Sequence, residues 1–190
     1  MNRPATLLVL LLAGLLTGCG GGSRPTGIRA AETPADDVAE YQPRWRSHTV
    51  DSTQYRKVFL AGTIDMGRSS DWQAALVARF RDSIGGRWLF FNPRRREFHA
   101  SPAEMEYQVA WELAHLEAAD LIVMNLLGDS RLPISLLEMG LYARSGKLFV
   151  ACSPDYYRYD NVRITCRRYG VPLYDSLTAL LDDLPQQSDE

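Results

Sequence analysis

The chain has 190 residues, of which 46% are hydrophobic and 23% are charged, the composition of an ordinary globular protein rather than a disordered one. It carries 21 basic and 23 acidic residues, so the formal charge of -2 gives no basic excess to attract polymeric nucleic acid. The three Cys are too few for a disulfide-built scaffold, and neither they nor the three His have metal-ligand spacing.

Residues 1–18 have the pattern of an export signal. Arg3 precedes an apolar run, residues 7–16, that is too short to cross a bilayer as a stable helix. The run leads into Thr17-Gly18-Cys19, which resembles the signal of bacterial lipoproteins, whose Cys is acylated and becomes the new N-terminus. Gly20 stands where an Asp often favours inner-membrane retention. We therefore expect lipidation of Cys19 and an outer-membrane anchor in the bacterial cell envelope, facing the periplasm, with an ordinary cleaved secretory signal as the alternative.

Residues 19–54 are predicted to be the lipidated Cys and a flexible tether. Glycines and prolines interrupt any regular pattern there, from the triplet at 20–22 to Pro43. Such a tether would hold a globular domain, residues 55–190, away from the membrane.

Within that domain, short apolar runs alternate with helical patterns. Runs typical of buried parallel strands lie at residues 58–61, 88–91, 121–124, 148–151 and 171–174. Helical patterns lie at residues 71–83, 101–119, 133–143, 161–169 and 176–184. This alternation predicts an α/β fold: a flavodoxin-like, doubly wound, five-stranded parallel sheet with helices on both faces.

Polar residues follow the predicted strands at the edge where ligands bind in such sheets. They are the loop Gly62-Thr63-Ile64-Asp65 after the first strand, Asn92 after the second and Asn125 after the third. A loop Asp is usually a turn former, which is the ordinary alternative for Asp65.

Glu138 lies in the helix predicted at residues 133–143. This helix is apolar nearly all round, which predicts burial, and Glu138 shares a face with Ile134 and Leu141. A buried unpaired carboxylate is costly, while the helix dipole would help to keep it ionised in the second turn. Glu138 is therefore a candidate nucleophile, or else a core acid paired with an Arg or a backbone group. Glu112, on the preceding helix, is a second candidate acid, whose ordinary alternative is a solvated helix face.

The order and spacing of these pieces resemble the nucleoside 2-deoxyribosyltransferases and related N-glycoside hydrolases. The resemblance covers residues 57–184 nearly throughout. Its segments are residues 59–67, 71–73, 92–95, 108, 111–113, 119–122 and, most specifically, 133–140.

The resemblance implies a flavodoxin-like fold and a nucleoside or nucleotide substrate, with no metal or redox cofactor. The family's catalytic Glu matches Glu138: it attacks the anomeric carbon, releases the base and holds the sugar as an ester until another base or water takes it, as in retaining glycosidases. The substrate-binding residues that we predict around it are Gly62, Thr63, Ile64, Asp65, Asn92, Glu112, Asn125, Ser135 and Asn161.

Asn161 is included because, in the family, a neighbouring subunit completes each active site, commonly through an Asn. The resemblance therefore implies a homo-oligomer. Two positions depart from the family: Leu132 replaces an Asp used in base recognition, and Phe59 replaces a Tyr that holds the nucleophile. These departures leave the base, and the choice between transfer and hydrolysis, open. The basic run at residues 94–96 could hold a 5′-phosphate, or form a solvated loop.

Two other functions compete with glycosyl transfer. A non-catalytic, nucleoside-binding envelope lipoprotein would keep the pocket without the chemistry. A flavin-binding flavodoxin is a weaker reading, because the loop at Gly62 lacks a Ser/Thr-rich phosphate loop. Cys152 and Cys166 are expected to be buried and unpaired, since a Cys at a strand end is commonly a small core residue.

Overall fold

The computed structural model describes residues 37–44, 50–65, 68–95 and 99–184. The predicted signal peptide and the lipidation site Cys19 lie outside these residues. Within the described ranges, no helix has the length and apolar character needed to cross a membrane.

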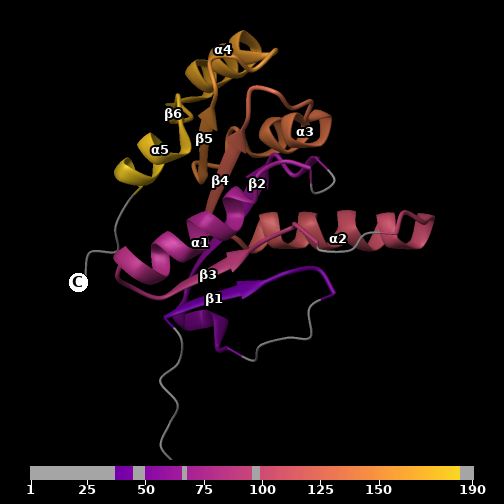
Figure 1. The fold of residues 1–190 in the computed structure, drawn as a ribbon, viewed down its shortest axis with the longest axis vertical. Coiled ribbons are helices and arrows are strands. Elements are labelled where there is room, and N and C mark those ends of the chain that lie inside the picture. Colours follow the sequence, from indigo (N-terminus) through magenta and orange to yellow (C-terminus); the bar gives the residue numbers. More distant parts are fainter. Residues whose placement is uncertain (1–36, 45–49, 66–67, 96–98, 185–190) are drawn as a thin grey trace, which may run out of the picture. The chain divides into compact units, whose positions relative to one another are not determined.

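One parallel sheet organises the described residues (Figure 1). Its six strands lie in the order β1-β3-β2-β4-β5-β6. They are β1 (Val38–Tyr41), β2 (Arg56–Gly62), β3 (Trp88–Phe91), β4 (Leu121–Leu126), β5 (Leu148–Cys152) and β6 (Leu173–Tyr174). The five strands from β2 to β6 are those predicted, and their order is the flavodoxin-like one, so the predicted α/β architecture is confirmed.

The sixth strand, β1, corrects the prediction of five strands and of a tether that continues to residue 54. Val38–Tyr41 pairs with β3 along its whole length, from Val38 beside Trp88 to Tyr41 beside Phe91. Val38 and Ala39 are buried, and Glu40 accepts a hydrogen bond from Asn92 Nδ2 at 2.7 Å. A four-residue run that includes an acid is too short for its hydrophobic pattern to reveal a strand.

Among the described residues, four α-helices connect the strands from β2 to β6 and a fifth follows β6, as predicted. They are α1 (Trp72–Ser83), α2 (Pro102–Ala118), α3 (Pro133–Tyr142), α4 (Tyr159–Tyr169) and α5 (Leu177–Asp183), with a short 3-10 turn at Ser52–Gln54. Side chains of Asp71, Ser101 and Ser176 cap the first turns of α1, α2 and α5. In contrast, α3 begins at Pro133 without any side-chain cap.

The sheet has a hydrophobic core on each face. On one face, Val58 and Leu60 of β2 pack with buried residues of α1 and α5. On the other, Phe59 and Ala61 of β2 pack with buried residues of α2, α3 and α4. The alternation along β2 therefore places α2 and α3 on the same face, where they flank the carboxyl ends of the central strands.

Candidate active site

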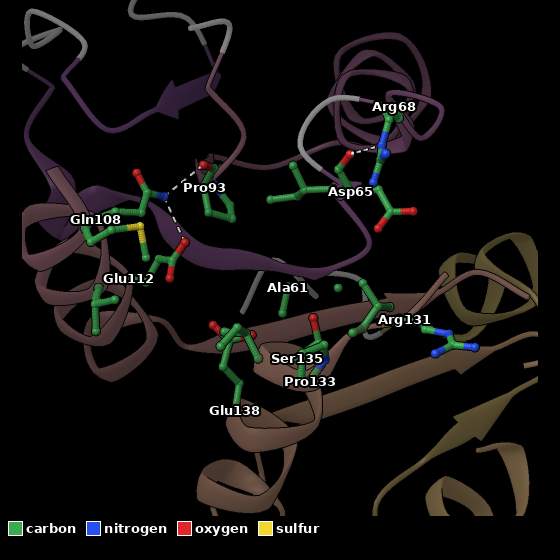
Figure 2. A pocket seen from close by; sticks show the side chains of 16 residues that line it. Ala61, Asp65, Arg68, Pro93, Gln108, Glu112, Arg131, Pro133, Ser135 and Glu138 are labelled. Atoms are coloured by element: carbon green, nitrogen blue, oxygen red, sulfur yellow. Dashed lines mark hydrogen bonds between the residues drawn. The ribbon is translucent and has the colours of Figure 1, made fainter. Parts of the chain in front are cut away.

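A cavity of about 500 Å³ lies at the carboxyl end of β2, between α2 and α3. Figure 2 shows the side chains of 16 residues that line it. Six of the predicted site residues are among them: Gly62, Ile64, Asp65, Glu112, Ser135 and Glu138. The cavity thus lies at the edge of the sheet where the strand-end rule predicts ligand binding.

Three other predicted site residues are buried beside the cavity and do not line it. Thr63 is fully buried: its hydroxyl accepts the Leu127 N–H at 3.0 Å. Asn125 is buried in β4, where its carbonyl accepts the Thr63 N–H at 2.9 Å. Asn92 donates to Glu40, and its side-chain oxygen accepts the Arg94 N–H at 3.0 Å. These three residues hold the ends of the strands together.

Asn161 lies elsewhere on the chain. It is exposed at the start of α4 and lines a second cavity of about 300 Å³, which α3 and α4 form together. Within one chain, therefore, Asn161 is not a wall of the cavity that contains Glu138.

The backbone of the loop after β2 adopts conformations that most residues do not tolerate. Gly62 has φ +115°, and a Cβ there would overlap the backbone of Asn125, so glycine is required where β2 and β4 come closest. Asp65 has φ +49°, a left-handed conformation that Asp tolerates better than most residues. The loop turns sharply because of these two residues, and this directs Ile64 and Asp65 to the cavity.

Helix α3 is not buried all round, contrary to the prediction. Its outer face is apolar and exposed, with Ile134 at 59%, Leu137 at 61% and Leu141 at 58% relative exposure. Its inner face carries Ser135, Glu138 and Met139, all buried. Glu138 therefore does not share a buried stripe with Ile134 and Leu141; it shares the buried face with another polar residue, one turn away.

Glu138 is only 8% exposed, and no described residue forms a hydrogen bond or ion pair with it. Burial, and secondarily the negative charge of Glu112, raise its pKa to about 8. This shift opposes the contribution that was expected from the helix dipole, which would help to keep the acid ionised. The dipole acts mainly within the first turn, and burial outweighs it in the second.

Glu112 faces Glu138 across the cavity (Figure 2). Burial raises the pKa of Glu112, although a hydrogen bond from Gln108 Nε2 at 2.8 Å opposes the shift. The same Gln108 amide donates to the Pro93 carbonyl at 3.2 Å, which fixes its position. Two neighbouring carboxyl groups with raised pKa values suit a pair in which one is ionised and the other holds a proton.

The two described arginines of the basic run at residues 94–96 are both engaged by other side chains and are not free to bind a phosphate. Arg94 donates to Gln73 at 3.1 Å and to the Ser69 hydroxyl at 2.9 Å, and its side chain is only 11% exposed. Arg95 forms an ion pair with Glu104 at 2.8 Å. Arg96 lies outside the described residues.

Sequence reasoning missed three polar residues that line the cavity: Arg68, Gln108 and Arg131. The spacing of Gln108 and Glu112 by four residues on one helix was a usable signal, since such pairs are neighbours. The two arginines carried none, because exposed arginines in loops are common. Figure 2 shows both at the end of the cavity opposite Gln108 and Glu112.

The cysteines and the possible metal ligands are the other side chains to consider for chemistry at this site. Cys152 and Cys166 are both buried and free, in the core behind the site. Among the residues that the structure describes, no group of three or more His, Cys, Asp or Glu side chains could hold a metal ion.

A buried acid without partners and a second, proton-holding acid can together support nucleophilic substitution at a sugar carbon. Residues 55–156 match the family model described as nucleoside 2-deoxyribosyltransferase like. No curated protein matches the chain. The match covers more than half of the sequence and contains β2 to β5 with both acids. The chain therefore belongs to the nucleoside 2-deoxyribosyltransferase-like family.

Proposed function

We propose that the protein cleaves the N-glycosidic bond of (deoxy)nucleosides and transfers the 2-deoxyribosyl group to another base, through an ester with Glu138. The observation that carries the proposal is the burial of Glu138, without partners, in the cavity of a chain that belongs to this family. An unpartnered buried carboxyl group is costly to keep, so it argues for use in chemistry.

In the first step, the ionised Glu138 carboxylate attacks the anomeric carbon. The bond from this carbon to the base nitrogen breaks, and its electron pair leaves with the base. Glu138 loses its proton before it attacks, and Glu112, whose pKa burial also raises, can take up this proton and return it to the departing base. In the second step, a nitrogen of another base attacks the same carbon, the ester to Glu138 breaks, and the incoming base loses a proton.

Hydrolysis is the second candidate, in which water attacks the ester instead of a base. Leu132 favours it, because this buried, apolar residue lines the cavity where an Asp for base recognition was expected. Without that carboxylate, the site has less means to hold an acceptor base against competing water.

One assay separates the candidates. The purified protein is incubated with a panel of deoxynucleosides and nucleotides, with and without a second free base, and the products are separated by chromatography. A new nucleoside establishes transfer, and free base alone establishes hydrolysis. Binding of a nucleoside that raises the melting temperature without turnover would instead indicate the non-catalytic binding protein.

We further propose that the enzyme is a homo-oligomer. Exposed apolar side chains flank the cavity on both sides: Met105, Val109 and Leu113 on α2, and Ile134, Leu137 and Leu141 on α3. A second copy that packs on these faces would remove them from water. Such an interface is also the route by which Asn161 of one copy can reach the cavity of another, since it lies outside the cavity of its own chain.

Sedimentation velocity tests this assembly. Leu137→Glu is expected to produce a monomer with lower activity, because a charge in an apolar interface lacks a partner. Arg167→Glu, which places the same residue at an exposed position on α4, is the matched control and should leave the assembly intact. A wild-type protein that sediments as a monomer at micromolar concentration would refute the proposal.

The predicted lipid anchor remains part of the proposed function. Acylated Cys19 would hold the enzyme at the outer membrane, facing the periplasm, where it would meet exported or imported nucleosides. Mass spectrometry of the mature N-terminus decides this: a diacylglyceryl Cys19 supports the anchor, and an unmodified N-terminus beyond it indicates an ordinary secretory signal.

A further inference from the structure

We propose that Gln108 is a positioning residue that keeps Glu112 ready to accept the proton of Glu138, an inference that rests on the proposed cleavage of N-glycosidic bonds. Arg95 and the Pro93 carbonyl hold Gln108 itself in place. Gln108 lines the cavity, but none of the reaction steps above uses it.

The side-chain amide of Gln108 has both of its polar atoms engaged. Its nitrogen donates to Glu112 Oε1 at 2.8 Å and to the Pro93 carbonyl at 3.2 Å, the two bonds drawn in Figure 2. Its oxygen accepts from Arg95 Nη1 at 3.4 Å. A guanidinium group can only donate hydrogen bonds, so the amide oxygen must face Arg95 and the nitrogen must face Glu112. A rotated amide would instead place its oxygen against the carboxylate of Glu112.

Arg95 is in turn fixed by an acid on the same helix as Gln108. The Arg95 side chain is only 13% exposed, and its Nη2 donates to Glu104 Oε2 at 2.8 Å. Glu104 also pairs with Arg44 at 2.7 Å, and hydrogen bonds from the two arginines lower the pKa of Glu104. Arg95 does not line the cavity, so it can act on a bound substrate only through residues such as Gln108.

The loop after β3, which carries Pro93, is also held by hydrogen bonds. Asn92 Nδ2 donates to Glu40 of β1 at 2.7 Å, and Asn92 Oδ1 accepts the Arg94 N–H at 3.0 Å. These bonds fix the carbonyl group that orients Gln108. Asn92 and Glu40 therefore support the site from neighbouring strands without lining the cavity.

The two acids of the cavity differ in the hydrogen bonds that they accept. Glu112 accepts the Gln108 N–H, and this bond opposes the rise in pKa that burial causes. Glu138 accepts a hydrogen bond from no described residue, and burial and the charge of Glu112 raise its pKa to about 8. A hydrogen bond to the charged form of an acid favours that form. Glu112 is therefore the acid that is ionised in the free site, and Glu138 is the acid that holds a proton.

This order of ionisation is the one that the reaction needs. Glu138 becomes a nucleophile when its proton moves to Glu112, and a Glu112 that had kept a proton of its own could not take it up. After burial, the cause that raises the pKa of Glu138 is the charge of Glu112. The other titratable or charged groups around the two acids are Asp65 and Arg68 of the loop after β2, Arg131 before α3, and Tyr142 of α3.

Steady-state kinetics as a function of pH test this role with Gln108→Leu, which removes the hydrogen bonds and nearly keeps the size of the side chain. We expect kcat to fall by about 10-fold to 100-fold, a part of what general acid–base catalysis contributes, and KM to change less. The rise of kcat/KM with pH should also move to lower pH. A Glu112 that keeps its proton no longer repels the ionised form of Glu138.

Two further variants show whether Gln108 acts through Glu112. Gln108→Leu combined with Glu112→Gln should move the pH profile no further than Glu112→Gln alone. Arg95→Met should move it in the same direction by a smaller amount, and it carries the test if Gln108→Leu does not fold. The matched control is Arg79→Met, which breaks an ion pair with Asp182 between α1 and α5, on the other face of the sheet. This control should keep the wild-type profile.

Carbon-13 NMR titration of the glutamate carboxyl carbons measures protonation without turnover. Glu112→Gln and Glu138→Gln assign the two signals by their loss. In the wild type, Glu112 should titrate at lower pH than Glu138. In Gln108→Leu, the Glu112 midpoint should move to higher pH and the Glu138 midpoint to lower pH, because the donor to Glu112 is gone.

Three results would overturn the positioning role. They are a higher KM with an unmoved pH profile, which would make Gln108 a direct substrate contact, shifts that add in the double variant, and a Glu112 titration that Gln108→Leu leaves unchanged. Failure of the proposed function is a separate result. In that case the wild-type protein releases no base from any nucleoside or nucleotide, while the NMR titration of Glu112 still depends on Gln108.

Discussion

Two sets of buried polar residues lie within the same part of the fold, and they differ in whether their side chains have hydrogen-bond partners within the protein. Thr63 and Asn92, at the ends of β2 and β3, have their side-chain groups bonded to neighbouring backbone or side chains. Ser135 and Glu138, on α3, are almost as deeply buried and have no partner among the described residues. Thr63 and Asn92 were predicted to bind substrate from the strand-end argument, whereas Ser135 and Glu138 were predicted as site residues on the helix that carries the family resemblance.

This difference separates the residues that stabilise the fold from the residues that we expect to act on a ligand. A protein satisfies nearly all of its buried polar groups, because each unsatisfied group costs stability. Bonded groups such as Thr63 and Asn92 therefore build the edge of the cavity. Ser135 and Glu138 line the cavity and have no hydrogen-bond partner among the described residues, so a ligand or a reaction is expected to supply one.

The largest predicted effect is on catalysis. Glu138→Gln should reduce base release by at least about 10³-fold, because the amide cannot form the ester with the anomeric carbon. Chromatographic release of free base measures it. Glu106→Gln, which changes an exposed acid on α2, is the matched control and should keep wild-type activity. Comparable turnover in the two variants would show that Glu138 is not the nucleophile.

The next effect is on stability, and it contrasts the two sets directly. Thr63→Val should lower the free energy of unfolding by about 1–3 kcal/mol, because it leaves the Leu127 N–H without its acceptor in a buried position. Ser135→Ala removes a hydroxyl without partners and should change stability by much less. Urea denaturation of both variants measures this. A larger loss for Ser135→Ala would mean that the two sets do not differ as described.

The pH dependence of activity should follow the raised pKa of Glu138. The nucleophile must be ionised, and in the free enzyme its pKa is about 8, so kcat/KM should rise with pH through that value. Glu112→Gln removes the smaller, Coulombic cause of the shift and leaves burial, so the rise should move to lower pH. A profile that is flat from pH 6 to 9, or unmoved in Glu112→Gln, would contradict the coupling of the two acids.

The smallest effect is on stability as a function of pH. The folded protein holds a proton on Glu138 up to a pKa of about 8, whereas the ordinary pKa is 4.5, so the native state binds more protons between these values. The free energy of unfolding should therefore fall as pH rises from about 4.5 to 8. Thermal melts at several pH values measure it. In Glu138→Gln the decline should be shallower, and an equal slope in both proteins would argue against the raised pKa.

Much of the fold was predictable, because its elements carry local signals. The strands β2 to β5 are continuous apolar runs, and α1, α2 and α5 begin at recognisable cap residues. Strand β1 was not predictable, since four residues that include Glu40 show no periodicity and gain their place only by pairing with β3. The exposed face of α3 was misjudged for a related reason: apolar composition does not tell a core from an outer surface.

The position of the candidate site could be predicted from the sequence, but only some of its residues could. The strand-end rule and the resemblance pointed to the loop after β2 and to the acids of α2 and α3, which the structure brings together around one cavity. They could not distinguish Asn92 from Ser135, because the partners that satisfy Asn92, such as Glu40, are distant in sequence. Arg131, which lines the cavity, lacked a local signal altogether, because exposed arginines in loops are common.

The most direct test of the central claim is intact-protein mass spectrometry after rapid acid quenching of the enzyme with a deoxynucleoside and, separately, with its 5′-monophosphate. We expect an added 2-deoxyribosyl group, or its phosphorylated form, on the intact protein, which digestion then places on the peptide that contains Glu138, and no such adduct in Glu138→Gln. Release of base from the wild type with no adduct on Glu138, together with full activity of Glu138→Gln, would contradict it.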